Sequence, residues 1–124
     1  MGSWLLLASV LLQFLLAGLG IFANATFLMW HTNVNGAVVL FLPLLLVLLG
    51  WLGRVPGRTL LLTAAITGLA LVQSLLLIPY HMRVDGLLRG IAGLHVLNAL
   101  LIFWVALQLL EQTRALEVSP TAPR

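Results

Sequence analysis

Residues 90–110 read GIAGLHVLNALLIFWVALQLL, and this uncharged stretch decides what kind of protein the chain forms. At a rise of about 1.5 Å per residue, about 20 apolar residues cross the hydrocarbon core of a bilayer as one helix. The stretch therefore predicts a membrane span. It also contains His95 and Asn98, which are three residues apart and so share one face of that helix. An ionisable side chain at this depth is a candidate functional residue.

The composition of the whole chain supports a membrane setting. Of its 124 residues, 62% are apolar and 7% are charged, whereas a soluble domain carries about 25% charged residues because its surface faces water. The six basic residues are all arginines and are scattered, so they form no basic stripe for nucleic acid. The chain has no cysteine, which excludes disulfides, thiolate metal sites and covalently attached c-type haem.

The charged residues divide the sequence into apolar windows. No charge occurs in residues 1–53, 59–82 or 90–110. The first window is long enough for two spans, and the other two hold one each. We therefore expect an all-α integral membrane four-helix bundle over residues 1–114. Its spans should lie near 4–22, 31–53, 59–80 and 89–110, with sequential helices antiparallel, and a disordered tail should follow at 115–124.

The arginines also predict an orientation. Four of them fall at the end of the bundle that holds both termini, and two fall at the other end: Arg54, Arg58, Arg114 and Arg124 against Arg83 and Arg89. The positive-inside rule then places both termini in the cytoplasm. We expect a bacterial cytoplasmic membrane protein whose immediate partner is the lipid bilayer.

The first span has an alternative interpretation as a cleaved signal peptide. Ala23-Asn24-Ala25 follows an apolar run and resembles a cleavage site. However, residues 1–3 contain no basic side chain, and the apolar run exceeds the usual length. We favour a retained span.

The two halves of the chain resemble each other in outline. Each half begins with a span that carries a glutamine, Gln13 or Gln73, and continues with a span that carries a histidine followed by an asparagine. Because each half contributes two helices, the halves would be related as a parallel repeat of two helical hairpins. Chance similarity in a leucine-rich background is the alternative.

His31 and His95 are the candidate cofactor ligands. Neutral imidazole is a strong axial ligand for haem iron, and bundle cores build such sites from facing helices. The second and fourth spans would therefore bind one b-type haem between them through these two histidines. Asn35 and Asn98 would supply hydrogen bonds that fix the imidazole orientations. Electron transfer would be the consequence.

Two further observations leave alternatives open. Counted from the inner ends at about 1.5 Å per residue, His31 lies about 30 Å up and His95 about 22 Å up. Ligands of one haem need similar heights, so the second helix would have to shift by one turn. Without haem, His31 is an interfacial residue and His95 an interhelical hydrogen-bonding residue. Copper is a third interpretation, because Met29 lies near His31 and Met82 follows His81.

The remaining polar residues point away from transport and catalysis. Three glutamines are expected to pair across helices, each bond contributing about 0.6–2 kcal/mol: Gln13, Gln73 and Gln108. The acidic residues lie outside the predicted spans, at positions 85, 111 and 117. Since proton-coupled pumps and cation transporters usually need an intramembrane carboxylate, we do not expect ion transport. No nucleophile and base occur in a catalytic pattern, so an enzyme is not expected either.

The four short spans, with a histidine opening the second and Leu94-His-Val-Leu-Asn-Ala-Leu100 in the fourth, resemble a family of small bacterial membrane proteins of unknown function. The layout is also distantly similar to four-helix b-type cytochromes, a resemblance that implies haem between two spans. The chain lacks the second histidine pair of the di-haem members. The alternative to a haem protein is a non-enzymatic accessory or interaction subunit of a membrane complex, with a membrane protein partner or a second copy of the chain.

Overall fold

A computed structural model describes residues 1–118, which form helices and short turns without any strand. Four helical segments are long and apolar enough to cross a membrane: Gly2–Phe22, Thr26–Leu52, Gly57–His81 and Leu87–Val118. Their elements are α1 (Gly2–Phe22), α2 (Thr26–Val34), η1 (Asn35–Leu40), α3 (Phe41–Leu52), α4 (Gly57–Leu75), α5 (Ile78–His81), α6 (Leu87–Gly90), η2 (Ile91–Gly93) and α7 (Leu94–Val118). The predicted all-α membrane bundle of four helices is confirmed.

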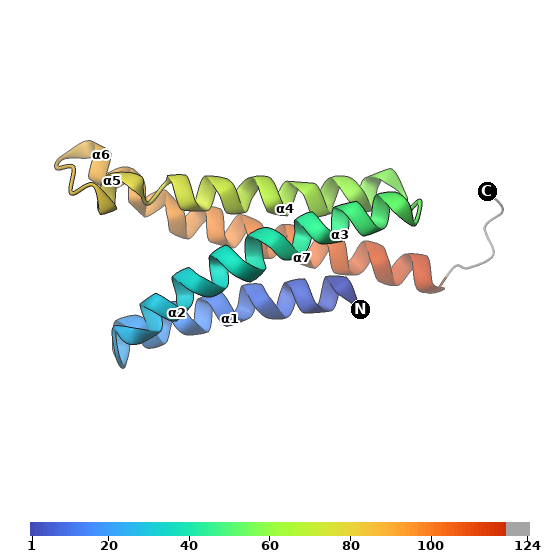
Figure 1. Cartoon of the computed structure of the whole chain (residues 1–124), viewed down its shortest axis with the longest axis horizontal. Helices are drawn as coiled ribbons and strands as arrows, with labels where there is room; N and C mark the ends of the chain where they lie inside the picture. Colours follow the sequence, from blue (N-terminus) through green and yellow to red (C-terminus); the bar gives the residue numbers. More distant parts are fainter. Residues whose placement is uncertain (119–124) are drawn as a thin grey trace.

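The bundle has two distinct ends (Figure 1). The N-terminus, the α3–α4 turn and the end of α7 lie at one end, which we call the terminal end. The α1–α2 turn and the short helices α5 and α6 lie at the other, which we call the loop end. The second span crosses the bundle obliquely, with α2 beside α1 near the loop end and α3 beside α4 near the terminal end.

The apolar core is built mainly from three of the four spans. Leu6 of α1, Ile66 of α4 and Ala106 of α7 are completely buried. The side chains packed around them also come from these helices, among them Val10, Ile102 and Leu109. The second span contributes little to this cluster and packs across α1 and α4 instead. It is therefore the span with the smallest share of the core.

The second span is also irregular in its middle. Residues Asn35–Leu40 form a π-helix, in which each N–H bonds five residues back rather than four. Pro43 follows three residues after the end of this π-helix and is fully buried. A proline inside a helix has no N–H to donate, and its ring clashes with the carbonyl four residues earlier, here that of Val39. A widened turn relieves this clash, which explains why the π-helix lies just before the proline.

Short motifs define the connections between spans. At the α1–α2 turn, the Asn24 side-chain oxygen accepts a hydrogen bond from the Thr26 N–H at 2.9 Å, so α2 begins five residues before the predicted start of the second span. At the ends of α3 and α5, Arg54 and Arg83 adopt left-handed backbone angles, with φ of 54° and 55°. In both turns the next residue donates its N–H back across the helix end, as in a Schellman motif.

The C-terminal boundary also differs from the prediction. α7 continues to Val118, so residues 115–118, expected to belong to a disordered tail, are helical. Ala115, Leu116 and Glu117 are good helix formers and extend the last span. The rest of the predicted tail, residues 119–124, lies outside the described residues.

Candidate functional site

The structure brings the two predicted histidine ligands together. His31 of α2 and His95 of α7 come from spans on opposite sides of the bundle, yet their ring centroids lie 6.3 Å apart with an interplanar angle of 60°. Both side chains are partly buried. The expected height difference of about 8 Å is therefore wrong. The oblique second span and its π-helical turn shorten the rise between its inner end and His31, which a count at ideal helical rise cannot include.

Each imidazole is held by the same kind of bond in each half of the chain. His31 Nδ1 lies 3.0 Å from the main-chain carbonyl oxygen of Gln13. His95 Nδ1 lies 3.1 Å from that of Gln73. A carbonyl oxygen only accepts, so each of these bonds needs the tautomer that carries its hydrogen on Nδ1, and in that tautomer the second ring nitrogen, Nε2, keeps its lone pair free.

In the second half, side chains complete the arrangement. Asn98 Nδ2 donates to Gln73 Oε1 at 2.6 Å and to the Leu69 carbonyl at 2.9 Å. Both hydrogens of the Asn98 amide are thereby used, and the amide joins α7 firmly to α4. Gln73, which is 5% exposed, thus binds His95 through its main chain and Asn98 through its side chain.

In the first half, the main chain takes the place of the asparagine side chain. In one of its two orientations, the Gln13 carboxamide makes two hydrogen bonds to the main chain of the second span. Its nitrogen donates to the His31 carbonyl at 2.9 Å, and its oxygen accepts from the Asn35 N–H at 3.0 Å. In this orientation the same nitrogen lies 2.8 Å from His31 Nδ1. His31 therefore has two tautomeric choices, and only the one in which Nδ1–H donates to the Gln13 carbonyl leaves Nε2 free for a ligand.

The histidines line a small, partly open cavity of about 210 Å³. Its polar lining comes from the two glutamines, the two histidines and Asn35, and the remainder is apolar. Val10 and Ile102 line the cavity and also belong to the apolar core. The cavity therefore lies against the core, with the completely buried layer of Leu6, Ile66 and Ala106 on its terminal side.

The four predicted site residues do not play equal parts. His31, His95 and Asn35 line the cavity, whereas Asn98 does not and acts on His95 through Gln73. The sequence pointed to Gln13 and Gln73 only as helix–helix contacts. Their carbonyl bonds to the histidines were missed, although the matched order of glutamine and histidine in the two halves could have indicated them.

Other polar and sulfur-containing side chains lie away from the site. Met29 and Met82 are largely exposed, and neither lines the cavity, so the geometry gives copper no support. His81 packs edge-on against Tyr80 at the end of α5, with ring centroids 5.6 Å apart. Gln108 was expected to pair across helices; it lies 3.4 Å from Glu111 of its own helix instead.

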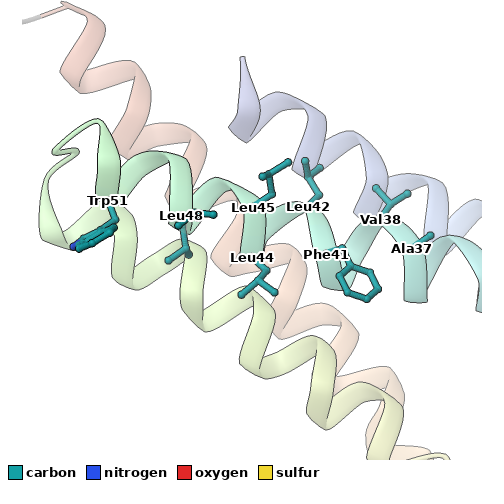
Figure 2. Close-up of a pocket in the computed structure, with 9 residues that line it drawn as sticks. Ala37, Val38, Phe41, Leu42, Leu44, Leu45, Leu48 and Trp51 are labelled. Carbon is teal, nitrogen blue, oxygen red and sulfur yellow. The ribbon is translucent and has the colours of Figure 1, made fainter.

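A hollow on the surface of the second span has a different character (Figure 2). It measures about 840 Å³ and is lined only by residues of the second span: Ala37, Val38, Phe41, Leu42, Leu44, Leu45, Val47, Leu48 and Trp51. None of these side chains carries a charge, and the only polar atom among them is the Trp51 indole nitrogen. A face of this composition on a membrane helix is suited to lipid chains.

Fold and site together define a small polytopic membrane protein with a polar histidine site inside a four-helix bundle. The chain belongs to a family of unknown function, DUF6220, whose model matches residues 13–81, more than half of its 124 residues. The match begins at Gln13 and includes His31, Asn35 and Gln73. His95 and Asn98 lie beyond it. No curated protein and no solved structure matches the chain.

Proposed function

We propose that this protein binds one b-type haem through His31 and His95 and serves in electron transfer. One observation carries the proposal: two imidazoles from opposite spans lie 6.3 Å apart, each with Nδ1 bonded to a main-chain carbonyl. Histidines that bind metal nearly always donate their other N–H in this way, which orients the ring and raises the basicity of Nε2.

The number of ligands favours haem over a bare metal ion. Within residues 1–118, no group of three or more His, Cys, Asp or Glu side chains is arranged to hold a metal. Structural zinc needs four protein ligands and catalytic zinc three. Haem would bring its other ligand nitrogens itself, so His31 and His95 would be sufficient to hold it. A haem held by His31 and His95 would supply one-electron chemistry.

The cavity sets a condition on this proposal. Its volume of about 210 Å³ is below the range of about 300–1,000 Å³ usual for small-molecule sites, so haem uptake requires the bundle to widen. The second span is the element suited to this movement. It contributes least to the core, and its π-helix contains two residues that line the cavity, Asn35 and Val39.

The test is an oxidised-minus-reduced absorption spectrum of the detergent-purified protein after expression with ample haem. We expect a Soret band and sharp reduced α and β bands. Both should disappear in His31→Ala and in His95→Ala. His81→Ala is the matched control, because His81 lies outside the cavity, and it should keep the spectrum.

A colourless wild-type protein that remains helical and takes up no added haem would contradict the proposal. The chain would then be treated as an accessory subunit without a cofactor, in which the histidines serve only to pair helices. Retention of the spectrum in either His31→Ala or His95→Ala would exclude the two-histidine site specifically.

We also propose that both termini face the cytoplasm. Arg54, Arg58 and Arg114 lie at the terminal end or just beyond it, whereas Arg83 and Arg89 lie at the loop end; the positive-inside rule favours this orientation. Single cysteines placed at residues 57 and 86 of this cysteine-free chain would test it with a membrane-impermeant thiol reagent. Labelling of intact cells at residue 57 rather than 86 would reverse the assignment.

A further inference from the structure

We infer that a polar hollow at the loop end binds a phosphate group, and that an anionic phospholipid supplies it. The hollow measures about 550 Å³ and is lined by Tyr80, His81, Arg83, Asp85 and Arg89. It shares no lining residue with the histidine cavity. Its occupancy is therefore independent of any group bound by the histidines, and a phosphate site here goes beyond the proposed function.

The hollow lies where two spans reach the membrane surface. The third span ends at His81 and the fourth begins at Leu87, and α5, α6 and the turn between them close this end of the bundle (Figure 1). Headgroup layers cover both sides of the hydrocarbon core of a bilayer. Residues at the ends of spans therefore lie at the depth of lipid phosphates, and basic pockets between membrane helices bind anionic lipid headgroups.

The lining gives the hollow a net positive charge when His81 is neutral. Its charged side chains are two guanidinium groups and one carboxylate, those of Arg83, Arg89 and Asp85. Arg89 Nη1 lies 3.8 Å from Asp85 Oδ1, and the Asp85 side chain is 94% exposed, so water screens this ion pair and it is weak. Within residues 1–118, Arg83 forms no salt bridge. Both guanidinium groups are therefore available to an incoming anion.

Neighbouring groups hold the two arginines in place. The Arg89 guanidinium lies over the Tyr80 ring, 5.7 Å from its centroid, in a cation–π contact that links the fourth span to the third. The Arg83 N–H donates to the Tyr80 carbonyl at 3.1 Å, and the Val84 N–H donates to the Pro79 carbonyl at 3.0 Å. These bonds fix the main chain on both sides of Arg83. Groups that are already positioned lose less conformational freedom when a ligand binds.

The chemistry of the lining matches a phosphate diester. A planar guanidinium presents parallel N–H groups and binds phosphate oxygens in pairs. The two non-ester oxygens of a diester share one negative charge, which matches the single net positive charge of the two arginines and Asp85. The Tyr80 hydroxyl adds a neutral donor.

The surroundings favour a lipid as the source of the phosphate. Exposed apolar side chains alternate in sequence with the polar residues of the hollow: Ile78, Met82, Leu87, Leu88 and Ile91. At the boundary between headgroups and acyl chains, such side chains bury their surface against the acyl chains. A phospholipid gains these contacts in addition to those of its phosphate, whereas a soluble phosphate compound does not.

The experiment measures lipid binding to the purified, delipidated protein in a neutral detergent and a phosphate-free buffer. Phosphatidylglycerol and phosphatidylcholine with the same acyl chains are titrated in turn, and native mass spectrometry counts the lipids that each protein molecule retains. The wild type should bind phosphatidylglycerol about tenfold more tightly, because phosphatidylcholine has the same phosphate but no net charge. In Arg83→Gln/Arg89→Gln this preference should fall at least about fivefold.

Two further variants separate the hollow from a general effect of charge. Arg54→Gln/Arg58→Gln removes the same charge from the terminal end, outside the hollow, and should keep the wild-type preference. Asp85→Asn removes the carboxylate that competes for Arg89, so it should tighten phosphatidylglycerol binding about threefold. A variant that merely failed to fold could not bind more tightly.

Inorganic phosphate distinguishes the two sources of the ligand. It should displace phosphatidylglycerol from the wild type only at a large molar excess, and displacement at equal concentration would exclude the lipid as the source. An unchanged preference in Arg83→Gln/Arg89→Gln, or an equal loss in Arg54→Gln/Arg58→Gln, would overturn the site itself. Neither result bears on the histidines, because the haem spectrum is measured separately and depends on His31 and His95.

Discussion

The two halves of the bundle hold their histidines with the same bond but support that bond by different means. In the second half, the Asn98 side chain, on the regular α-helix α7, donates one hydrogen bond to Gln73 and one to the Leu69 carbonyl, and so ties α7 to α4. In the first half, the Gln13 side chain pairs with main-chain groups at His31 and Asn35, at the start of a π-helix.

The connections between the two spans of each half also differ. The first hairpin closes tightly: a Cβ at Gly20 would lie 2.5 Å from Leu28 Cδ2 and 3.0 Å from the Leu28 nitrogen. Gly20 follows Gln13 by seven residues, and the residue seven positions after Gln73 is Tyr80. The second hairpin therefore has a large aromatic side chain where the first has a glycine. Its two spans do not meet in a tight turn there, because α5 and α6 connect them.

The comparison shows that the same histidine–carbonyl bond can be supported by two sets of contacts that differ in rigidity. The second half is fixed by side-chain bonds, and the first half combines a close helix contact with a deformable turn. We therefore expect α4 and α7 to form the permanent wall of the site and the second span to form the wall that moves. Four predictions test this contrast.

The largest expected effect is that of Gly20→Ala. The added methyl group clashes with both the side chain and the main chain of Leu28, so the free energy of unfolding should fall by about 1–3 kcal/mol. Gly68→Ala is the control, since a Cβ there meets nothing within 4 Å. Denaturant titration in micelles measures both. Equal stability of the two variants would show that the first hairpin is not closely packed.

The asparagines should respond unequally. Asn98→Leu removes two hydrogen bonds and leaves buried Gln73 Oε1 without its donor, which should cost about 1–2 kcal/mol of unfolding free energy. Asn35→Leu should cost clearly less, because the bond to Gln13 comes from the Asn35 main-chain N–H and survives the substitution. The same titration applies, and a reversed order would contradict the contrast between the halves.

Local unfolding should be most frequent in the π-helix of the second span. Amide hydrogens of Asn35–Leu40 should exchange at least about fivefold faster than those of residues 94–99, since local unfolding concentrates where packing and hydrogen bonding are weakest. Hydrogen exchange of the apoprotein in micelles, read by mass spectrometry, gives both rates in one sample. Uniform protection of the two segments would remove the argument that the second span is the moving wall.

The smallest effect is expected at the α5–α6 connection. Asp85→Asn removes a 3.8 Å ion pair between two largely exposed side chains, and exposed pairs of this kind contribute little. We expect no measurable change in the melting temperature of the apoprotein. A clear destabilisation would instead make this connection part of the folded core of the second hairpin.

The sequence was sufficient for the architecture, because apolar length and the positions of charge determine how many spans form. It also identified His31 and His95, since polar groups are conspicuous among apolar residues. It failed on their relative height, which depends on the tilt of the second span and on the π-helical turn before Pro43. Neither quantity follows from counting residues. The Gln13 and Gln73 carbonyls were equally hidden, because every residue has one and only packing selects which are used.

The fully buried layer of Leu6, Ile66 and Ala106 has an electrical consequence. A transmembrane voltage falls mainly across regions without water or polar groups, and one elementary charge that crosses the whole membrane at 100 mV exchanges about 2.3 kcal/mol with the field. This layer lies on the terminal side of the histidine cavity. A charge that reaches the histidines from the loop end avoids it, and one that passes on to the terminal end must cross it. Any charge passed on from the histidines toward the terminal end would therefore move through the most completely apolar layer of the bundle.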